Sequence, residues 1–331
     1  MLDKEYKSLT LRLGFALILM LVLLQVLMTG LSFGQLLFEA FLIEKAADIL
    51  YWSLYNLFYM LSFMLPVPFF MLISGKKRGE PIRFEVRFPR HFALMAIAIV
   101  GVTLAAGQIN ALIMSPFTGE SSSTDMLLDM LSPDKGYMAV LVFMMIVIVP
   151  AFCEEFLFRG LVLGNLLPYS KGIAVIGSAL LFAAMHQNFG QFLYTAIAGI
   201  FLGILYAESR SIWPSTIVHM LNNLLSFVQM IVYARIPDEL TAGRVTLCID
   251  LAVIGPGIAC AVVLMLLQGR KSKAEKQDDG MFGRIDLPEQ PRALSEGVAW
   301  RKFFSPTIIT FIALSFLLAL GNLLLENLLY E

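Results

Sequence analysis

The residues from Met138 to Leu167 read MAVLVFMMIVIVPAFCEEFLFRGLVLGNLL, an apolar run broken by only three charges. A bilayer span needs about 20 mostly apolar residues, arranged as a helix that satisfies its own backbone, because lipid offers no hydrogen-bond partners. Ionisable side chains are costly inside such a span and usually mark a functional site. The stretch therefore predicts a transmembrane helix in which Glu154, Glu155 and Arg159 have a function.

The apolar character extends over the whole chain. Of its 331 residues, 58% are hydrophobic and 15% are charged, whereas soluble domains average about 45–50% apolar and about 25% charged residues. The formal net charge is −1, so no global field favours nucleic acid as a partner. We expect an all-α fold, a polytopic transmembrane helical bundle that has the lipid bilayer as its solvent.

Apolar stretches of spanning length predict about eight or nine spans. The first is too long for the apolar core of a cleavable signal, about 7–15 residues, so we expect it to be retained. The fifth and sixth are short and separated only by 187–190, so they form either two spans or a re-entrant or tilted pair. The predicted spans lie near residues 9–31, 50–74, 92–114, 137–167, 172–188, 191–207, 212–233, 246–268 and 304–329.

Loop charges predict an orientation. Residues 76–90 carry six Lys and Arg against two Glu, and the stretch from Arg270 to Lys276 is also basic. Between Ser115 and Gly136 the charges are mainly acidic. Short basic loops remain cytoplasmic. We therefore expect an integral membrane protein of a bacterial cell membrane, with a cytoplasmic N-terminus and, for nine spans, the acidic loop outside.

The costly polar side chains of the predicted spans fall in a few helices. They are Gln108 and Asn110 in the third span, Glu154, Glu155 and Arg159 in the fourth, His186 in the fifth, and His219, Asn222 and Asn223 in the seventh.

The spacing within the fourth span separates its two carboxylates. Glu155 and Arg159 are four residues apart and share a helix face in the favourable order for an ion pair. Glu154 lies about 100° round the helix. Arg159 is therefore expected to neutralise Glu155 and leave Glu154 available for another partner.

His186 is the partner that we expect for Glu154. Counted from the turn around Pro168, both residues lie roughly 20 Å deep at a rise of about 1.5 Å per residue. His219 and Asn223 are four residues apart and share a face of the seventh span. The fourth, fifth and seventh helices are therefore expected to converge on one cavity.

Three motifs run through these helices in order. They are EExxxR at Glu154–Arg159, FxxxH at Phe182–His186 and HxxxN at His219–Asn223. Each motif alone is weak, but the set resembles the CAAX protease and bacteriocin-processing (CPBP, or Abi) family of intramembrane glutamic endopeptidases. The resemblance covers residues 137–233.

The resemblance implies a role for each motif residue. Glu154 and His186 would activate water for attack on a peptide carbonyl, and His219 and Asn223 would stabilise the oxyanion. Glu155 and Arg159 would support the fourth helix. The resemblance also implies a membrane-associated peptide or protein as substrate, as for the type II CAAX endopeptidases, whose eukaryotic members cleave prenylated CAAX proteins. No cofactor is expected.

Other functions remain open. Two His and two Glu suit zinc, although no HExxH is present and Asn223 is a poor zinc ligand but a good oxyanion donor. Cys153 would have to displace Glu154 to act as a nucleophile. A bacteriocin-immunity or membrane scaffold role needs no catalysis. A transporter would usually contain an internal repeat, and we find none.

We expect the chain to divide into a catalytic core on spans four to seven and flanking segments. These are 1–136, N-terminal spans with the basic cytoplasmic loop; 137–233, the core; 234–268, a further span; 269–303, a cytoplasmic linker; and 304–331, the C-terminal span.

Overall fold

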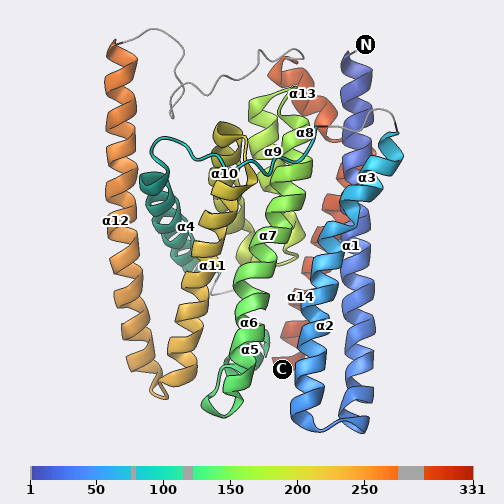
Figure 1. Ribbon diagram of the computed structural model, residues 1–331, viewed down its shortest axis with the longest axis vertical. Coiled ribbons are helices and arrows are strands. Elements are labelled where there is room, and N and C mark those ends of the chain that lie inside the picture. Colours follow the sequence, from blue (N-terminus) through green and yellow to red (C-terminus); the bar gives the residue numbers. More distant parts are fainter. Residues whose placement is uncertain (1, 76–79, 115–121, 275–293, 331) are drawn as a thin grey trace.

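The computed structural model describes residues 2–75, 80–114, 122–274 and 294–330. Within these ranges the secondary structure is helical, with no strand. Eight of the described helices are long and apolar enough to cross a membrane, and they pack as a bundle (Figure 1). The predicted all-α polytopic fold is confirmed.

The elements follow one another as α1 (Leu2–Phe41), α2 (Glu44–Met64), α3 (Pro66–Ser74), α4 (Phe92–Met114), α5 (Ser122–Met130), η1 (Pro133–Met138), α6 (Ala139–Phe143), η2 (Met144–Ile148), α7 (Val149–Glu155), η3 (Phe156–Leu163), α8 (Gly164–Leu166), α9 (Lys171–Met185), α10 (Phe189–Ser209), α11 (Ile212–Arg235), α12 (Glu239–Ala274), α13 (Glu296–Phe303) and α14 (Pro306–Tyr330).

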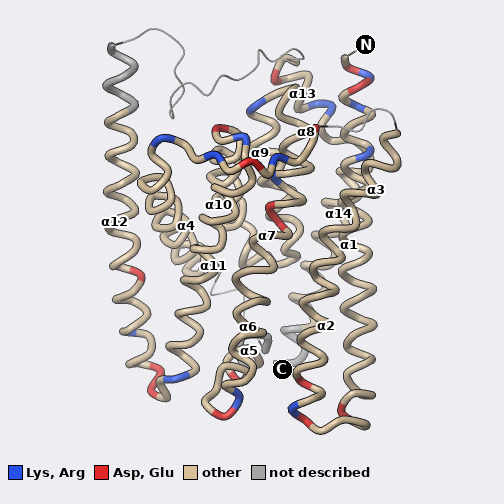
Figure 2. Tube along the Cα trace, viewed as in Figure 1, with Lys and Arg blue, Asp and Glu red and all other residues tan. Residues whose placement is uncertain are grey.

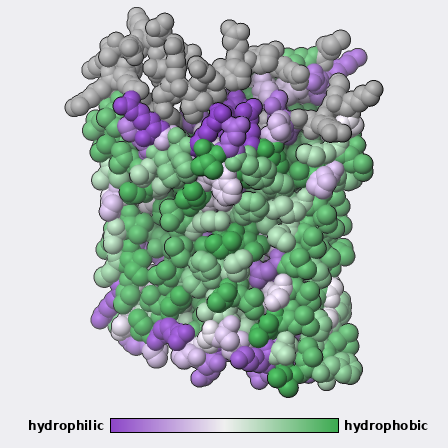
Figure 3. Space-filling model, in the orientation of Figure 1, coloured by the Kyte–Doolittle hydropathy of each residue, from purple (hydrophilic) through white to green (hydrophobic). Residues whose placement is uncertain are grey.

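The surface has the polarity of a membrane protein. Hydrophobic side chains cover the middle of the face in Figure 3, and hydrophilic ones gather at its two ends. Basic residues are concentrated at the end that holds the N-terminus (Figure 2). This distribution matches a bundle whose middle lies in lipid and whose ends reach water.

The fourth predicted span is one irregular helix. It passes through two π-helical segments, η2 and η3, on either side of α7, which carries Glu154 and Glu155. Pro150, in the first turn of α7, has no N–H to donate, so the regular hydrogen-bond ladder cannot continue through it. π-Bulges often occur at functional sites. Glu154 and Glu155 lie between the two π-helical segments, and Arg159 lies within the second.

The fifth predicted span is too short to cross. α9 has 15 residues, about 22 Å at a rise of about 1.5 Å per residue, against a hydrocarbon core of about 30 Å. It packs antiparallel to α10, where Gly199 permits close approach: a Cβ there would lie 3.0 Å from Cα of Ala179. The core therefore contains a short helix whose turn into α10 lies inside the bundle.

The predicted basic loop is a strap across the end of the core. The carbonyl of Arg83 accepts a hydrogen bond from the backbone N of Ile212 at 3.1 Å. The indole N–H of Trp213 donates to the carbonyl of Phe84 at 2.8 Å, and the backbone N of Glu80 donates to Oδ1 of Asn165 at 2.9 Å. Its described part therefore ties the ends of α8 and α11 together.

The predicted linker 269–303 contains a docked helix. Its residues 275–293 lie outside the described ranges. In α13, Ala299 and Phe303 are buried in the main core, and Oε1 of Glu296 accepts a hydrogen bond from Ser170 at 2.6 Å. The C-terminal part of this segment is thus attached to the start of α9.

Candidate active site

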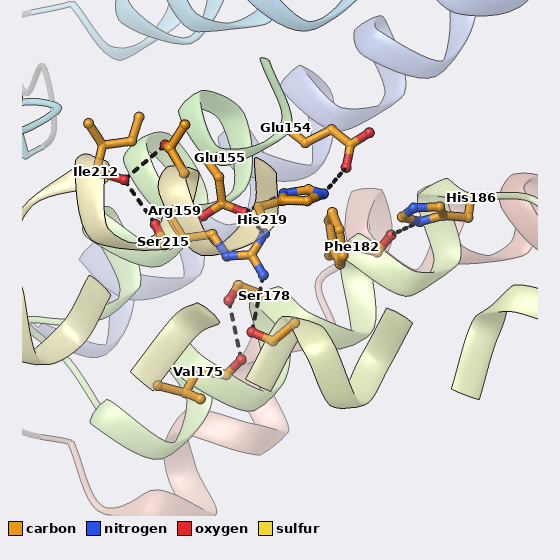
Figure 4. Close-up of polar contacts among 12 residues, drawn as sticks. Glu154, Glu155, Arg159, Val175, Ser178, Phe182, His186, Ile212, Ser215 and His219 are labelled. Atoms are coloured by element: carbon orange, nitrogen blue, oxygen red, sulfur yellow. Dashed lines mark hydrogen bonds and ion pairs between the residues drawn. The ribbon is translucent and has the colours of Figure 1, made fainter. Parts of the chain in front are cut away.

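Three separate elements bring the predicted site residues near one another (Figure 4). The fourth span supplies Glu154, Glu155 and Arg159, the end of α9 supplies His186, and α11 supplies His219. Glu154 and Glu155 are buried, at 4% and 0% exposed. Ionised groups at such depth must be paired or hydrogen-bonded.

The predicted pair of Glu155 and Arg159 is present. Nη1 of Arg159 lies 2.7 Å from Oε1 of Glu155, and both side chains are almost fully buried. Nη2 of Arg159 donates to the carbonyl of Gly199 at 3.1 Å, and the guanidinium carbon lies 4.5 Å from the ring centroid of Phe182. Arg159 therefore joins the fourth span to α9 and α10.

His219 bridges the two glutamates. Its Nδ1 lies 3.1 Å from Oε1 of Glu155, and its Nε2 lies 3.8 Å from Oε2 of Glu154. An ionised carboxylate only accepts hydrogen bonds, so Nδ1 carries the hydrogen when it faces Glu155. Glu155 thereby fixes the tautomer and ring orientation of His219 and turns Nε2 toward Glu154.

Glu154 has a partner that the sequence did not indicate. The hydroxyl of Tyr59, on α2, donates to Oε1 of Glu154 at 2.5 Å. Oε2 is buried and has no hydrogen-bond partner in the described part of the chain. Tyr59 stacks on Phe63, with 4.7 Å between ring centroids. One carboxylate oxygen is therefore held from outside the core, and the other is free.

His186 differs from its prediction. The expected contact with Glu154 is absent from the hydrogen bonds and ion pairs of the described residues. Instead, Nδ1 of His186 lies 2.9 Å from the carbonyl of Phe182, one turn earlier. Because a carbonyl only accepts, Nδ1 carries the hydrogen in the neutral ring and Nε2 is the free nitrogen.

Phe182, the first residue of the FxxxH motif, stands between the two histidines (Figure 4). Its ring meets that of His186 edge-on, with centroids 4.8 Å apart, and that of His219 edge-on at 5.9 Å. It also lies under the Arg159 guanidinium. The aromatic ring thus packs against both imidazoles and separates them. The motif alone does not indicate this role for its phenylalanine.

A cavity of about 60 Å³ opens beside the histidines. Its lining includes Thr103, His186, Tyr194, His219, Asn222 and Asn223. Three of the four predicted catalytic residues therefore share one cavity. Glu154 is not among its lining residues, and its Oε1 accepts the hydrogen bond from Tyr59. The expectation that all four side chains line a single cavity is therefore corrected: three of them line it and Glu154 does not.

Asn222 and Asn223 differ in what they contact. The hydroxyl of Thr103, on α4, donates to Oδ1 of Asn222 at 2.9 Å, so Asn222 helps to attach α11 to α4. Both asparagines are half-buried and line the cavity. An asparagine amide group carries two N–H donors. The cavity wall therefore offers donors from Asn223 beside those from the imidazoles.

The geometry agrees with a comparison against protein families. The model described as type II CAAX prenyl endopeptidase Rce1-like matches residues 136–225. This segment belongs to the CAAX protease-like family. The match begins and ends close to the limits 137–233 expected from the motifs, and it contains all six predicted site residues. Searches of curated proteins and of solved structures found no match.

The site residues do not form a metal-binding cluster in the described part of the chain. In the described parts of the chain, no three His, Cys, Asp or Glu side chains are grouped as ligands for a metal ion. Glu155 is engaged by Arg159, and Oε1 of Glu154 by Tyr59. The family that this segment matches is a protease family, and Tyr59, from outside the matched range, contacts Glu154.

Proposed function

We propose that this protein is an intramembrane endopeptidase in which Glu154 activates the attacking water. The observation that carries the proposal is the free Oε2 of Glu154, 3.8 Å from an imidazole nitrogen whose orientation is fixed by a second glutamate. A buried carboxylate with one oxygen held and one free is suited to take a proton from water. General base assistance contributes about 10²–10⁴-fold in rate.

His186 would act on the same water from the cavity side. Its Nε2 is left free by the contact between Nδ1 and the Phe182 carbonyl. Because His186 does not contact Glu154 directly, a water or the substrate carbonyl would occupy the space between them. Catalytic contacts are often long before substrate binds. The pair expected from the resemblance is therefore proposed to form through the reactant.

His219 and Asn223 are proposed to stabilise the tetrahedral oxyanion. Both line the cavity, and they are one helical turn apart on α11. An imidazolium at His219 presents N–H on both nitrogens, one to Glu155 and one to the developing charge. Loss of one oxyanion donor typically lowers kcat by about 10²–10³-fold.

The substrate class follows from the surroundings. The cavity lies within a bundle of eight apolar, spanning-length helices, so a membrane-associated peptide or protein is the substrate that reaches it most directly. We propose hydrolysis without a metal cofactor, in a bacterial cell membrane, with the N-terminus on the cytoplasmic side because the basic strap lies at that end.

The test is peptide cleavage by the purified protein in lipid nanodiscs. The variants are Glu154→Gln, His186→Ala and Asn223→Ala, with the exposed Glu39→Gln as a matched control, each with and without a chelator. Wild type and the control should cleave, the three site variants should be slower by about 10²-fold or more, and the chelator should change nothing.

Other outcomes assign other functions. Loss of cleavage with chelator and its recovery with zinc would replace the proposed route by a zinc-dependent one. Full activity of the Glu154→Gln variant would show that Glu154 is not the general base. If no peptide is cleaved and Glu154→Gln keeps the protein's effect in cells, the bacteriocin-immunity or scaffold role replaces the protease.

A further inference from the structure

The turn between α9 and α10 breaks the helical hydrogen-bond pattern inside the bundle. α9 ends at Met185 and α10 begins at Phe189, and α9 is too short to bring this turn to the far side of a bilayer. Backbone groups freed at membrane depth must find partners within the protein. The residue just before this turn is His186, so the turn and the imidazole share one stretch of backbone.

Gln187 makes the turn. Its φ is 50°, in the left-handed region that is unfavourable for most residues with a side chain. It is also buried, at 7% exposed. Its side-chain Oε1 accepts a hydrogen bond from Nε2 of Gln25, on α1, at 2.7 Å. A polar contact from a distant helix therefore holds the strained residue that follows His186.

Two more amide side chains donate to carbonyls in this turn and at the start of α10. Nδ2 of Asn322, on α14, donates to the carbonyl of Gln187 at 3.3 Å. Nδ2 of Asn110, on α4, donates to the carbonyl of Gly190, and Asn110 is 4% exposed. Three amides from three helices therefore converge on residues 187–190, which are otherwise surrounded by apolar spans.

The chemistry of these contacts fits a clamp on the turn and the start of α10. An amide supplies donors without a charge, so it can satisfy a carbonyl in an apolar layer without the desolvation cost of an ion. All three helices lie outside the matched segment 136–225. Their polar side chains are therefore directed at the turn that follows the catalytic histidine.

We propose that Gln25, Asn110 and Asn322 are positioning residues that hold the turn at Gln187, and through it the His186 imidazole at the cavity wall. The inference rests on the proposed role of His186. Loss of a clamp residue lets the turn relax, which displaces the ring, and a misplacement of about 1 Å can lower the rate by about 10²-fold. Substrate binding elsewhere in the cavity is unaffected.

The kinetic test uses Gln25→Leu and Asn110→Leu, with Gln35→Leu as a matched control. Gln35 is an exposed amide on the same helix as Gln25 and contacts Glu39. The clamp variants should lose about 10- to 100-fold in kcat with little change in KM, and the control should lose nothing. Gln25→Asn tests whether a shorter amide restores part of the rate.

Measuring the Gln25→Leu substitution in a protein that also lacks His186 separates a positioning role of Gln25 from general destabilisation of the fold. In His186→Ala protein, Gln25→Leu should have no further effect on kcat, because the ring that it positions is gone. An equal loss of kcat in both backgrounds would overturn the proposal and leave Gln25 with a structural role only. Wild-type rates in both clamp variants would overturn it as well.

A spectroscopic readout keeps the test independent of peptidase activity. The chain has three histidines, so the ring nitrogens of His186 can be assigned by ¹⁵N NMR with a His186→Ala reference. Gln25→Leu should move the His186 signals and leave those of His91 in place. Unchanged His186 signals would overturn the clamp, whereas an inactive wild type with shifted signals would refute only the proposed function.

Discussion

The hydroxyl of Tyr59 donates a hydrogen bond to Oε1 of Glu154 at 2.5 Å. This contact joins α2, which precedes the matched segment, to the carboxylate that we propose as the base. It leaves Oε2 as the free oxygen of Glu154. The N-terminal spans therefore complete the site rather than merely enclosing it.

Tyr59→Phe should lower kcat by about 10-fold while the protein remains folded. Hydrogen bonds to charged groups contribute about 1.5–3 kcal/mol, and without this one the carboxylate can rotate away from His219. Steady-state cleavage measures the effect. Tyr55→Phe, one turn earlier on the same helix, is the matched control and should have the wild-type rate. A Tyr59→Phe enzyme as active as this control would show that the contact does not orient Glu154.

Arg159→Met should destabilise the fold by about 3–5 kcal/mol, because it leaves Glu155 as an uncompensated buried charge. Adding Glu155→Gln removes that charge and should recover most of the stability. Equilibrium unfolding in detergent measures both variants. The double variant should nevertheless remain slow in cleavage, since His219 loses the carboxylate that orients it. Recovery of activity along with stability would contradict the role assigned to Glu155.

Another buried carboxylate, that of Asp250, is held by residues outside the proposed site. Oδ2 of Asp250, on α12, accepts from Gln108 at 2.8 Å, and Oδ1 accepts from Gln229 at 2.5 Å. These contacts tie α12 to α4 and α11. Asp250→Leu should lower the free energy of unfolding by about 1–3 kcal/mol and leave kcat of the folded protein near wild type. A loss of kcat without a loss of stability would instead make Asp250 part of the reaction.

The ion pair within the fourth span was predictable from the sequence. Glu155 and Arg159 are paired as their four-residue spacing indicates. Among the described residues, Glu154 makes no hydrogen bond or ion pair with His186 and contacts Tyr59 and His219 instead. The fourth span contains π-helical turns on both sides of Glu154, and α9 ends at Met185.

Contacts between distant spans were not predictable from one sequence. Tyr59 is one of several tyrosines in an apolar helix, and nothing in its spacing points to Glu154. Gln25 and Asn322 interrupt apolar spans, which marks them as costly, but their shared partner is the Gln187 turn. Asn322 contacts a backbone carbonyl of this turn, and a contact with the backbone leaves no pair of side chains that the sequence could indicate.

The central claim is that Glu154 takes the proton from the attacking water. Its most direct test is the single-turnover cleavage rate of the Glu154→Gln variant in nanodiscs. The Glu155→Gln variant is measured alongside, and both variants are first shown to be folded. Glutamine keeps the hydrogen bond from Tyr59 through its carbonyl oxygen but cannot act as a base. The account predicts a rate lower than wild type by about 10²–10⁴-fold. A Glu154→Gln rate equal to wild type would contradict it.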